Sequence, residues 1–309
     1  MRILANYINN SRRLSDGGQS EIHLLDTRQD MIWYGEGYPD FYTDRIDEVC
    51  DKYKPDVLFY CGSNLRYSQT RGLENIKIPV VVMMADAQYD TYRTIHLLKN
   101  SNLKLMIFRY KAAMYFYDAL KVEKVWHPLG LRTDIFKDYN LPKDYDICLL
   151  QALSRAYPTR LKAHRLLGDS KFKLFTRPHP GYNTNGFLNL NSLIKDEYAK
   201  AINRSKIFVT SGGWYNAVLT KHFEILGSHT LLMCPFPKYG KELGFQDKVN
   251  MVKFEVDCSD LLEKVEYYLT HDKERNSITD AGYKLVNEKH TIQQRAEKLN
   301  KILEDRFGG

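Results

Sequence analysis

The stretch Ser211-Gly-Gly-Trp-Tyr-Asn-Ala-Val-Leu-Thr-Lys-His-Phe-Glu-Ile-Leu-Gly-Ser-His-Thr-Leu-Leu-Met-Cys234 decides the fold. It follows Lys206–Thr210, a short β-forming run that ends at paired glycines, and it contains a second apolar run, Thr230–Met233. Between the two runs the pattern predicts a helix over Asn216–Leu226, with Gly227 as its C-terminal stop. A strand, a glycine turn, a helix and a strand in this order are typical of a βαβ unit in a parallel sheet.

Two features of this unit indicate a ligand. The paired Gly212 and Gly213 allow the backbone to approach a ligand closely and leave amide N–H groups for an anion. On the predicted helix, Asn216 and Glu224 are two turns apart and therefore lie roughly on one side. Glu224 sits at the margin of a buried face, although an ordinary solvated helix carboxylate accounts for it equally well.

A wider pattern runs from this stretch towards the end of the chain. Its members are Asn216, Lys221-His222-Phe223-Glu224, Gly227, Leu231-Leu232, Tyr267-Tyr268-Leu269, His290-Thr291 and Arg295-Ala296. The pattern resembles the nucleotide-sugar half of GT-B glycosyltransferases, and most closely their CgeB-like (spore maturation protein) branch. The resemblance implies that Glu224 holds the ribose hydroxyls of the donor. The chain departs from the branch at Lys221, where arginine is usual, and from the larger family at Asn216, where retaining enzymes often carry a glutamate.

This resemblance implies an α/β fold of the GT-B type, with two Rossmann-like domains whose parallel sheets face each other across a cleft. We expect residues 1–135 to form the N-terminal, acceptor-side domain and residues 136–290 the C-terminal, nucleotide-sugar-binding domain. Residues 291–309 are expected to form a helix that packs back on the N-terminal domain. Apolar runs that alternate with helical patterns in both halves agree with parallel sheets.

Composition bounds the class of protein. A chain of 309 residues is long enough for two domains that each bury a core. It has no apolar run long enough to cross a membrane, and its N-terminus lacks the pattern of a signal peptide. Five widely spaced cysteines predict free thiols and a cytoplasmic location. The net charge of +7 suits an acidic ligand such as a nucleoside diphosphate.

In the first half, acidic residues follow a predicted strand, Ile78–Met84. Ligands of parallel sheets bind at the carboxyl ends of the strands, which places Asp86 and Asp90 at the mouth of this domain. The GT-B resemblance implies that a residue after this strand lies near the reacting sugar, so Asp86, followed by Asp90, is our candidate for catalysis. A helix N-cap or an Asx-turn is the alternative role for Asp86. The loop after the first predicted strand contains Gly17 and Gly18, where the resemblance implies that acceptor and donor meet; Asp-Gly-Gly is also a common surface turn.

In the second half, the predicted donor site combines the quoted stretch with basic residues. Its candidates are Gly212, Gly213, Trp214, Tyr215, Asn216, Lys221, Glu224, Arg155, Arg160 and His179. Arg155 and Arg160 lie around a predicted helix start, where the resemblance places the donor diphosphate, and guanidinium groups bind phosphate oxygens bidentately. His179 lies in a His-Pro that resembles the phosphate contact of CMP-type transferases, although a turn rich in Pro and Gly needs no function.

No metal and no cofactor is expected. Asp144-Tyr145-Asp146 has the letters of a DxD metal motif but precedes a predicted strand instead of following one. The leading interpretation is a metal-independent glycosyltransferase that uses a nucleoside-diphosphate sugar, with a UDP-sugar favoured, and a glycan or other hydroxyl acceptor. One alternative is a sugar transferase that acts on nucleic acid, with phosphate contacts from Arg12, Arg13, Lys52 and Lys54. Another is a non-catalytic GT-B-like protein that binds nucleotides or glycans.

Overall fold

The chain forms two compact units in the computed structural model. The described residues are 1–6, 25, 29–35, 38–62, 70–88, 90–179 and 193–309, except for the side chain of Trp214. Within them, the first unit comprises the residues up to Leu129 together with Gln293–Gly309, and the second comprises Gly130–Ile292. The first unit is therefore assembled from both ends of the chain.

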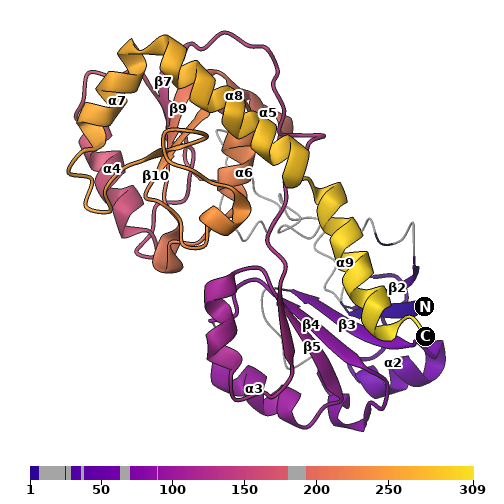
Figure 1. Ribbon diagram of the computed structural model, residues 1–309. Coiled ribbons are helices and arrows are strands. Elements are labelled where there is room, and N and C mark those ends of the chain that lie inside the picture. Colours follow the sequence, from indigo (N-terminus) through magenta and orange to yellow (C-terminus); the bar gives the residue numbers. More distant parts are fainter. Residues whose placement is uncertain (7–24, 26–28, 36–37, 63–69, 89, 180–192) are drawn as a thin grey trace. The chain divides into compact units, whose positions relative to one another are not determined.

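The first unit contains a six-stranded sheet in the order β2-β1-β3-β4-β5-β6, of which Figure 1 labels β2, β3, β4 and β5. Its strands are β1 (Arg2–Asn6), β2 (Asp30–Tyr34), β3 (Val57–Gly62), β4 (Val80–Met84), β5 (Leu103–Phe108) and β6 (Glu123–Trp126). All pairings are parallel. Parallel neighbours require crossover connections, and helices supply several of them. The described helical segments of this unit are α2 (Ile46–Tyr53), η3 (Leu73–Asn75), α3 (Thr91–Lys99), η4 (Lys111–Tyr117) and α9 (Ile292–Phe307).

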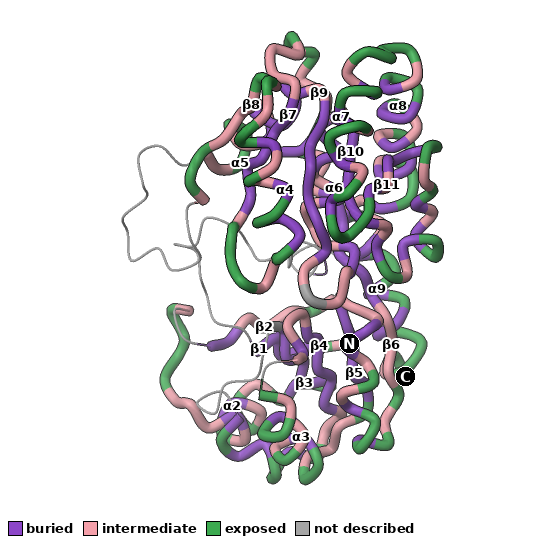
Figure 2. The backbone as a smooth tube through the Cα atoms, turned by 90° about the vertical axis from the view of Figure 1, so that its left-hand side faces the viewer, coloured by how far each residue is buried: buried purple, intermediate pink, exposed green. Residues whose placement is uncertain are grey.

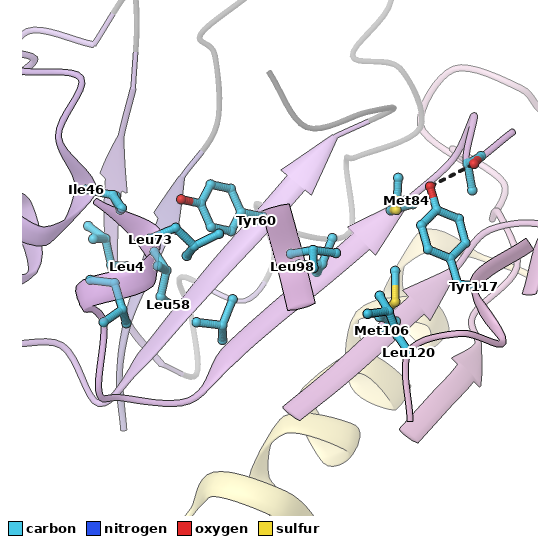
Figure 3. Packing of buried hydrophobic residues seen from close by; sticks show 14 of the residues in the cluster. Leu4, Ile46, Leu58, Tyr60, Leu73, Met84, Leu98, Met106, Tyr117 and Leu120 are labelled. Carbon is cyan, nitrogen blue, oxygen red and sulfur yellow. Dashed lines mark hydrogen bonds between the residues drawn. The ribbon is translucent and has the colours of Figure 1, made fainter. Parts of the chain in front are cut away.

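The central strands of this sheet, β1, β3, β4 and β5, are mostly buried on both faces and are largely purple in Figure 2. Successive side chains of a strand point to opposite faces, so the all-apolar β4 supplies both cores. Its residues Val80, Val82 and Met84 pack in one cluster with residues of α2, α3 and η4, part of which appears in Figure 3. Val81 and Met83 pack in a second cluster with Leu299, Ile302 and Leu303 of α9. The last helix of the chain thus covers one face of the first sheet.

The second unit contains a five-stranded parallel sheet in the order β11-β10-β9-β7-β8. Its strands are β7 (Tyr145–Cys148), β8 (Leu174–Phe175), β9 (Ser205–Val209), β10 (Leu231–Cys234) and β11 (Val252–Lys253). The described helical segments are α4 (Pro158–Gly168), α5 (Lys195–Asn203), η5 (Gly213–Tyr215), α6 (Thr220–Gly227), η6 (Lys241–Leu243), α7 (Leu261–Thr270) and α8 (Asp272–Lys289). The predicted α/β class with two Rossmann-like, parallel-sheet units is confirmed.

The helix predicted over Asn216–Leu226 begins later than expected. A 3-10 turn, η5, comes first, and α6 starts only at Thr220. Asn216 separates them because it adopts the left-handed conformation, with φ of 46°. Gly227 is the last residue of α6 and needs no positive φ; a Cβ on it would lie 2.5 Å from Leu131 Cδ1, so its role is to admit that side chain.

No helix in the described part of the chain combines the length and the apolar character that crossing a bilayer requires.

Candidate functional site

The candidate site of the second unit lies at the carboxyl ends of β7 and β9. Central strands of a parallel sheet present their loops at this edge, which is where ligands bind in open α/β sheets. The loop after β9 leads through Gly212 and Gly213 into η5 and then α6, and the loop after β7 leads into α4. Predicted residues from both loops and from α6 therefore approach one another.

The glycines of the β9 loop are required by its shape. A Cβ on Gly212 would lie 2.5 Å from Ala217 O and 2.7 Å from Ala217 N, which are backbone atoms. Gly213 has φ of +69°, and a Cβ there would lie 2.9 Å from the ring of Tyr157. Close packing of the loop on itself thus accounts for Gly212, and the positive φ and the Tyr157 ring account for Gly213, without a ligand. It also leaves a compact backbone at the strand end.

Asn216 connects this loop by hydrogen bonds to the segment after β10. Its side-chain Nδ2 donates to Phe236 O at 2.7 Å, and its carbonyl accepts the N–H of Lys238 at 2.6 Å. Tyr215 is half-buried beside it. Trp214 lies in η5, but its side chain falls outside the described residues.

Arg160 holds the same loop from α4. Its Nε and Nη2 donate to Ser211 O at 3.2 and 2.7 Å, and its guanidinium lies 3.8 Å from the ring centroid of Tyr157. The residue is only 3% exposed. Arg160 therefore brings a positive charge to the strand end while two of its donor nitrogens serve the backbone. Arg155 is exposed and forms no hydrogen bond or ion pair within the described part of the chain.

Lys221 and Glu224 form the charged centre of this edge. Lys221 Nζ lies 3.8 Å from Glu224 Oε2, and both side chains are 18% exposed. The ammonium also donates to Leu150 O at 3.3 Å and to the hydroxyl of Tyr198, a residue of α5. Burial lowers the pKa of Lys221, and the Glu224 carboxylate opposes that shift. The pair places a carboxylate beside a cation at a partly open strand end.

Two histidines accompany these cations. Burial, followed by the positive charges of Lys221 and Arg160, lowers the pKa of His179, which is thereby favoured in its neutral form. His222 is fully buried, and burial lowers its pKa to about 3. Its Nδ1 accepts the N–H of Leu219 at 3.0 Å, so Nε2 carries the proton of the neutral ring.

In the first unit, Asp86 follows β4 and is half-buried. Burial raises its pKa, and a hydrogen bond with Gln88 acts in the opposite direction. A raised pKa suits a general base. Asp90 is instead exposed at the N-cap position of α3, where it forms an ion pair with Arg93 at 3.5 Å and makes no capping hydrogen bond. Gly17 and Gly18 lie outside the described residues.

Both carboxylates of the DxD-like sequence form ion pairs with basic side chains. Asp144 is paired with Arg204, and Asp146 with Lys206 at 2.8 Å. Among the described residues no group of three or more His, Cys, Asp or Glu side chains is arranged to hold a metal ion.

Sequence reasoning missed Tyr198 as a site residue, and did not assign His222 a role beyond its place in the pattern. Tyr198 had no local signal, because it belongs to another helix and meets Lys221 only through the fold. His222 could have been suspected from its position between Lys221 and Glu224.

Comparisons with known proteins give a family match over the second half of the chain. Residues 149–301 match the family model described as glycosyl transferase-like. A search of curated proteins finds no match.

Solved structures resemble the whole chain. Alr3699/HepE of Anabaena, in complex with UDP-glucose, has a TM-score of 0.70 at 10% identity, with 99% of this chain and 100% of that chain covered. Sucrose-phosphate synthase of Thermosynechococcus elongatus has a TM-score of 0.70 at 10% identity, with 100% and 99% covered. A glycosyltransferase of Rickettsia africae ESF-5 has a TM-score of 0.64 at 12% identity, with 98% of each chain covered. These structures show that the chain has the GT-B fold.

Proposed function

We propose that this protein transfers a sugar from a nucleoside-diphosphate sugar, with a UDP-sugar favoured, to a hydroxyl group of a glycan or another acceptor. The observation that carries the proposal is the Lys221–Glu224 pair at the strand ends of the second unit, inside the segment that matches the glycosyl transferase-like model. A partly exposed carboxylate can accept hydrogen bonds from two ribose hydroxyls. The resemblance to the CgeB-like branch belongs to the same proposal.

The diphosphate would lie beside the glycine loop. Arg155 is exposed and pairs with no other group among the described residues, so its guanidinium is placed to bind phosphate oxygens. Arg160 and Lys221 contribute positive charge from fixed positions, and the backbone N–H groups of the loop add further donors. Such preorganised donors stabilise the negative charge that develops on a leaving diphosphate. We propose that these residues act without a metal ion.

The acceptor hydroxyl would be activated from the first unit. Asp86 is our candidate for the general base because burial raises its pKa towards the range useful at neutral pH. Asp90 is the weaker candidate, since its carboxylate is exposed and already paired with Arg93. The five free cysteines favour a reducing compartment such as the cytoplasm.

The first experiment is a thermal-shift panel with UDP, GDP, TDP, ADP, CDP and CMP, alone and as sugar conjugates, with and without EDTA. A ligand at about 100 times its dissociation constant adds about 2.7 kcal/mol to the free energy of unfolding. We expect stabilisation by one diphosphate, with UDP first, that EDTA leaves unchanged. A preference for CMP would shift the assignment to His179, and no response to any nucleotide would refute the proposal.

A pair of variants tests the ribose contact. Glu224→Gln should weaken binding of the preferred diphosphate about tenfold or more, because a hydrogen bond to a charged group contributes about 1.5–3 kcal/mol. Glu263→Gln, which alters an exposed carboxylate of α7, is the matched control and should bind normally. Equal affinity of both variants would contradict the role of Glu224. Turnover of the sugar donor separates the enzyme from a binding protein, and a steep loss of DNA or RNA affinity with salt would favour the nucleic-acid alternative.

A further inference from the structure

The ammonium of Lys221 is already provided with acceptors. A lysine has three N–H donors, and here they face Leu150 O at 3.3 Å, the Tyr198 hydroxyl, and Glu224 Oε2 at 3.8 Å. The ammonium also lies 4.6 Å from the ring centroid of Tyr198 and 5.6 Å from that of Phe208. Lys221 is therefore held by groups of the protein, and a phosphate could accept a hydrogen bond from its ammonium only by displacing an existing partner.

Tyr198 lies beside both charges. Its hydroxyl accepts a hydrogen bond from Lys221 and donates to Leu150 O at 3.5 Å, and the Glu224 carboxylate is near enough to act on it electrostatically. Burial, and then the Glu224 carboxylate, raise the pKa of Tyr198 well above its usual value, so the hydroxyl keeps the proton that it donates. Tyr198 itself is fixed by α5 and by an edge-on contact with the ring of Phe136 at 5.9 Å.

This geometry has a consequence for Glu224. At 3.8 Å the Lys221–Glu224 pair is longer than a hydrogen bond, because the ammonium is shared with the Tyr198 hydroxyl and Leu150 O. Without the Tyr198 hydroxyl, the strongest acceptor left for Lys221 would be the Glu224 carboxylate. A direct ion pair would then occupy oxygens that would otherwise accept from a ligand.

We propose that Tyr198 is a positioning residue of the donor site: its hydroxyl draws the Lys221 ammonium away from Glu224, so that the carboxylate can accept the ribose hydroxyls of the nucleotide. The inference rests on the proposed function, because it assumes a nucleotide at Glu224. It assigns the recognition of ribose to a network of three residues on two helices, α5 and α6.

The test compares the affinities of UDP and 2′,3′-dideoxy-UDP by isothermal titration calorimetry. The wild-type protein should prefer UDP about tenfold or more, as expected for hydroxyl groups bound to a carboxylate. In Tyr198→Phe, which removes one oxygen atom, the preference should fall to about twofold or less while the affinity for the dideoxy compound stays the same. If Tyr198 had only a structural role, its replacement would weaken the binding of both nucleotides alike and leave the ratio of their affinities unchanged.

Tyr139→Phe is the matched control. The Tyr139 hydroxyl also hydrogen-bonds to α5, donating to Asp196 Oδ1 at 2.9 Å, but it makes no contact with Lys221 or Glu224. This variant should keep the full preference for UDP. If Tyr198→Phe fails to fold, Lys221→Met serves as the second variant: no ammonium is left there to form an ion pair with Glu224, so the preference should remain within about threefold of the wild type.

The outcomes distinguish the inference from the proposed function. If the wild-type protein prefers UDP and Tyr198→Phe keeps that preference, the role of Tyr198 is overturned and the donor site stands. The same holds if Lys221→Met abolishes the preference. Equal wild-type affinity for the two nucleotides overturns the ribose contact and this inference with it, while nucleotide binding stands. No binding of any nucleotide, sugar-linked or free, refutes the proposed function itself.

Discussion

Replacing Gly212 by alanine tests whether the tight β9 loop depends on space or on backbone freedom. The φ of Gly212 is −83°, a value that alanine adopts without strain. The new Cβ would nevertheless lie 2.5 Å from Ala217 O, 2.6 Å from Asn216 C and 2.7 Å from Ala217 N, all well below the 3.4 Å at which ordinary contact begins. These are backbone atoms, so no rotamer change relieves the overlap.

The loop must therefore shift, and the hydrogen bond from Ala217 N to Gly212 O at 3.2 Å is strained or lost. Overpacking of this kind costs about 1–3 kcal/mol, and we expect Gly212→Ala to lower the free energy of unfolding by that amount. The measurement is urea unfolding, in which the midpoint should fall while the slope m is unchanged. Affinity for the preferred nucleotide should fall as well, because the loop lies beside the proposed diphosphate position.

Gly168→Ala is the control for this prediction. Gly168 ends α4, and a Cβ there would have no atom within 4 Å. Alanine at such a position stabilises by about 0.4–1 kcal/mol, since it restricts the unfolded chain. A cost below about 0.5 kcal/mol for Gly212→Ala, or an equal loss in both variants, would refute the steric reasoning.

Three further predictions concern other parts of the protein. Burial holds the pKa of His222 at about 3 in the folded state, below its unfolded value near 6.5, so the unfolded chain takes up this proton first. This contribution to stability is therefore complete above pH 6.5 and is lost on acidification, by up to about 1.4 kcal/mol per pH unit. In chemical unfolding between pH 4 and 8, His222→Gln should lack this part of the dependence of the unfolding free energy on pH. Parallel pH profiles of the variant and the wild type would contradict the prediction. Leu303→Ala should cost about 2–5 kcal/mol in urea unfolding, because the side chain is fully buried in the core that α9 forms with the first sheet; a loss under 1 kcal/mol would show that α9 is dispensable there. Asp86→Asn should reduce the transfer rate about 10²–10⁴-fold without changing donor affinity if Asp86 is the base, whereas a wild-type rate would exclude that role.

Much of the secondary structure follows from local pattern. Val80–Met84 is apolar throughout and bounded by a proline and polar residues, and it forms β4 as a buried strand should. Asp272–Lys289 forms α8, and the acidic residues at its start favour a helix N-terminus. The edge strand β2 and the short β11 were not predicted. Both are defined by pairing with a neighbour, which local pattern does not contain.

The start of α6 could not be predicted for the same reason. Asn216 reads as part of a helix, but its side chain bonds to Phe236 O and its backbone is left-handed. Likewise, the apolar segment Lys111–Tyr117 forms the 3-10 segment η4 and no α-helix, and its Tyr117 hydroxyl donates to Ala87 O at 2.9 Å. In both places a contact between distant parts of the chain competes with the local preference for α-helix.

By itself, the sequence determined that the chain is an α/β protein with two halves, and it placed Lys221 and Glu224 three residues apart on one helix face. The tertiary structure alone decided what surrounds that pair. Tyr198 reaches it from α5, and Arg160 binds Ser211 O, 51 residues further along the chain. Both contacts arise because the sheet order β10-β9-β7 sets strand ends side by side that are far apart in sequence. Periodicity reports which face of an element is buried, but the register and order of strands depend on the packing of the whole unit.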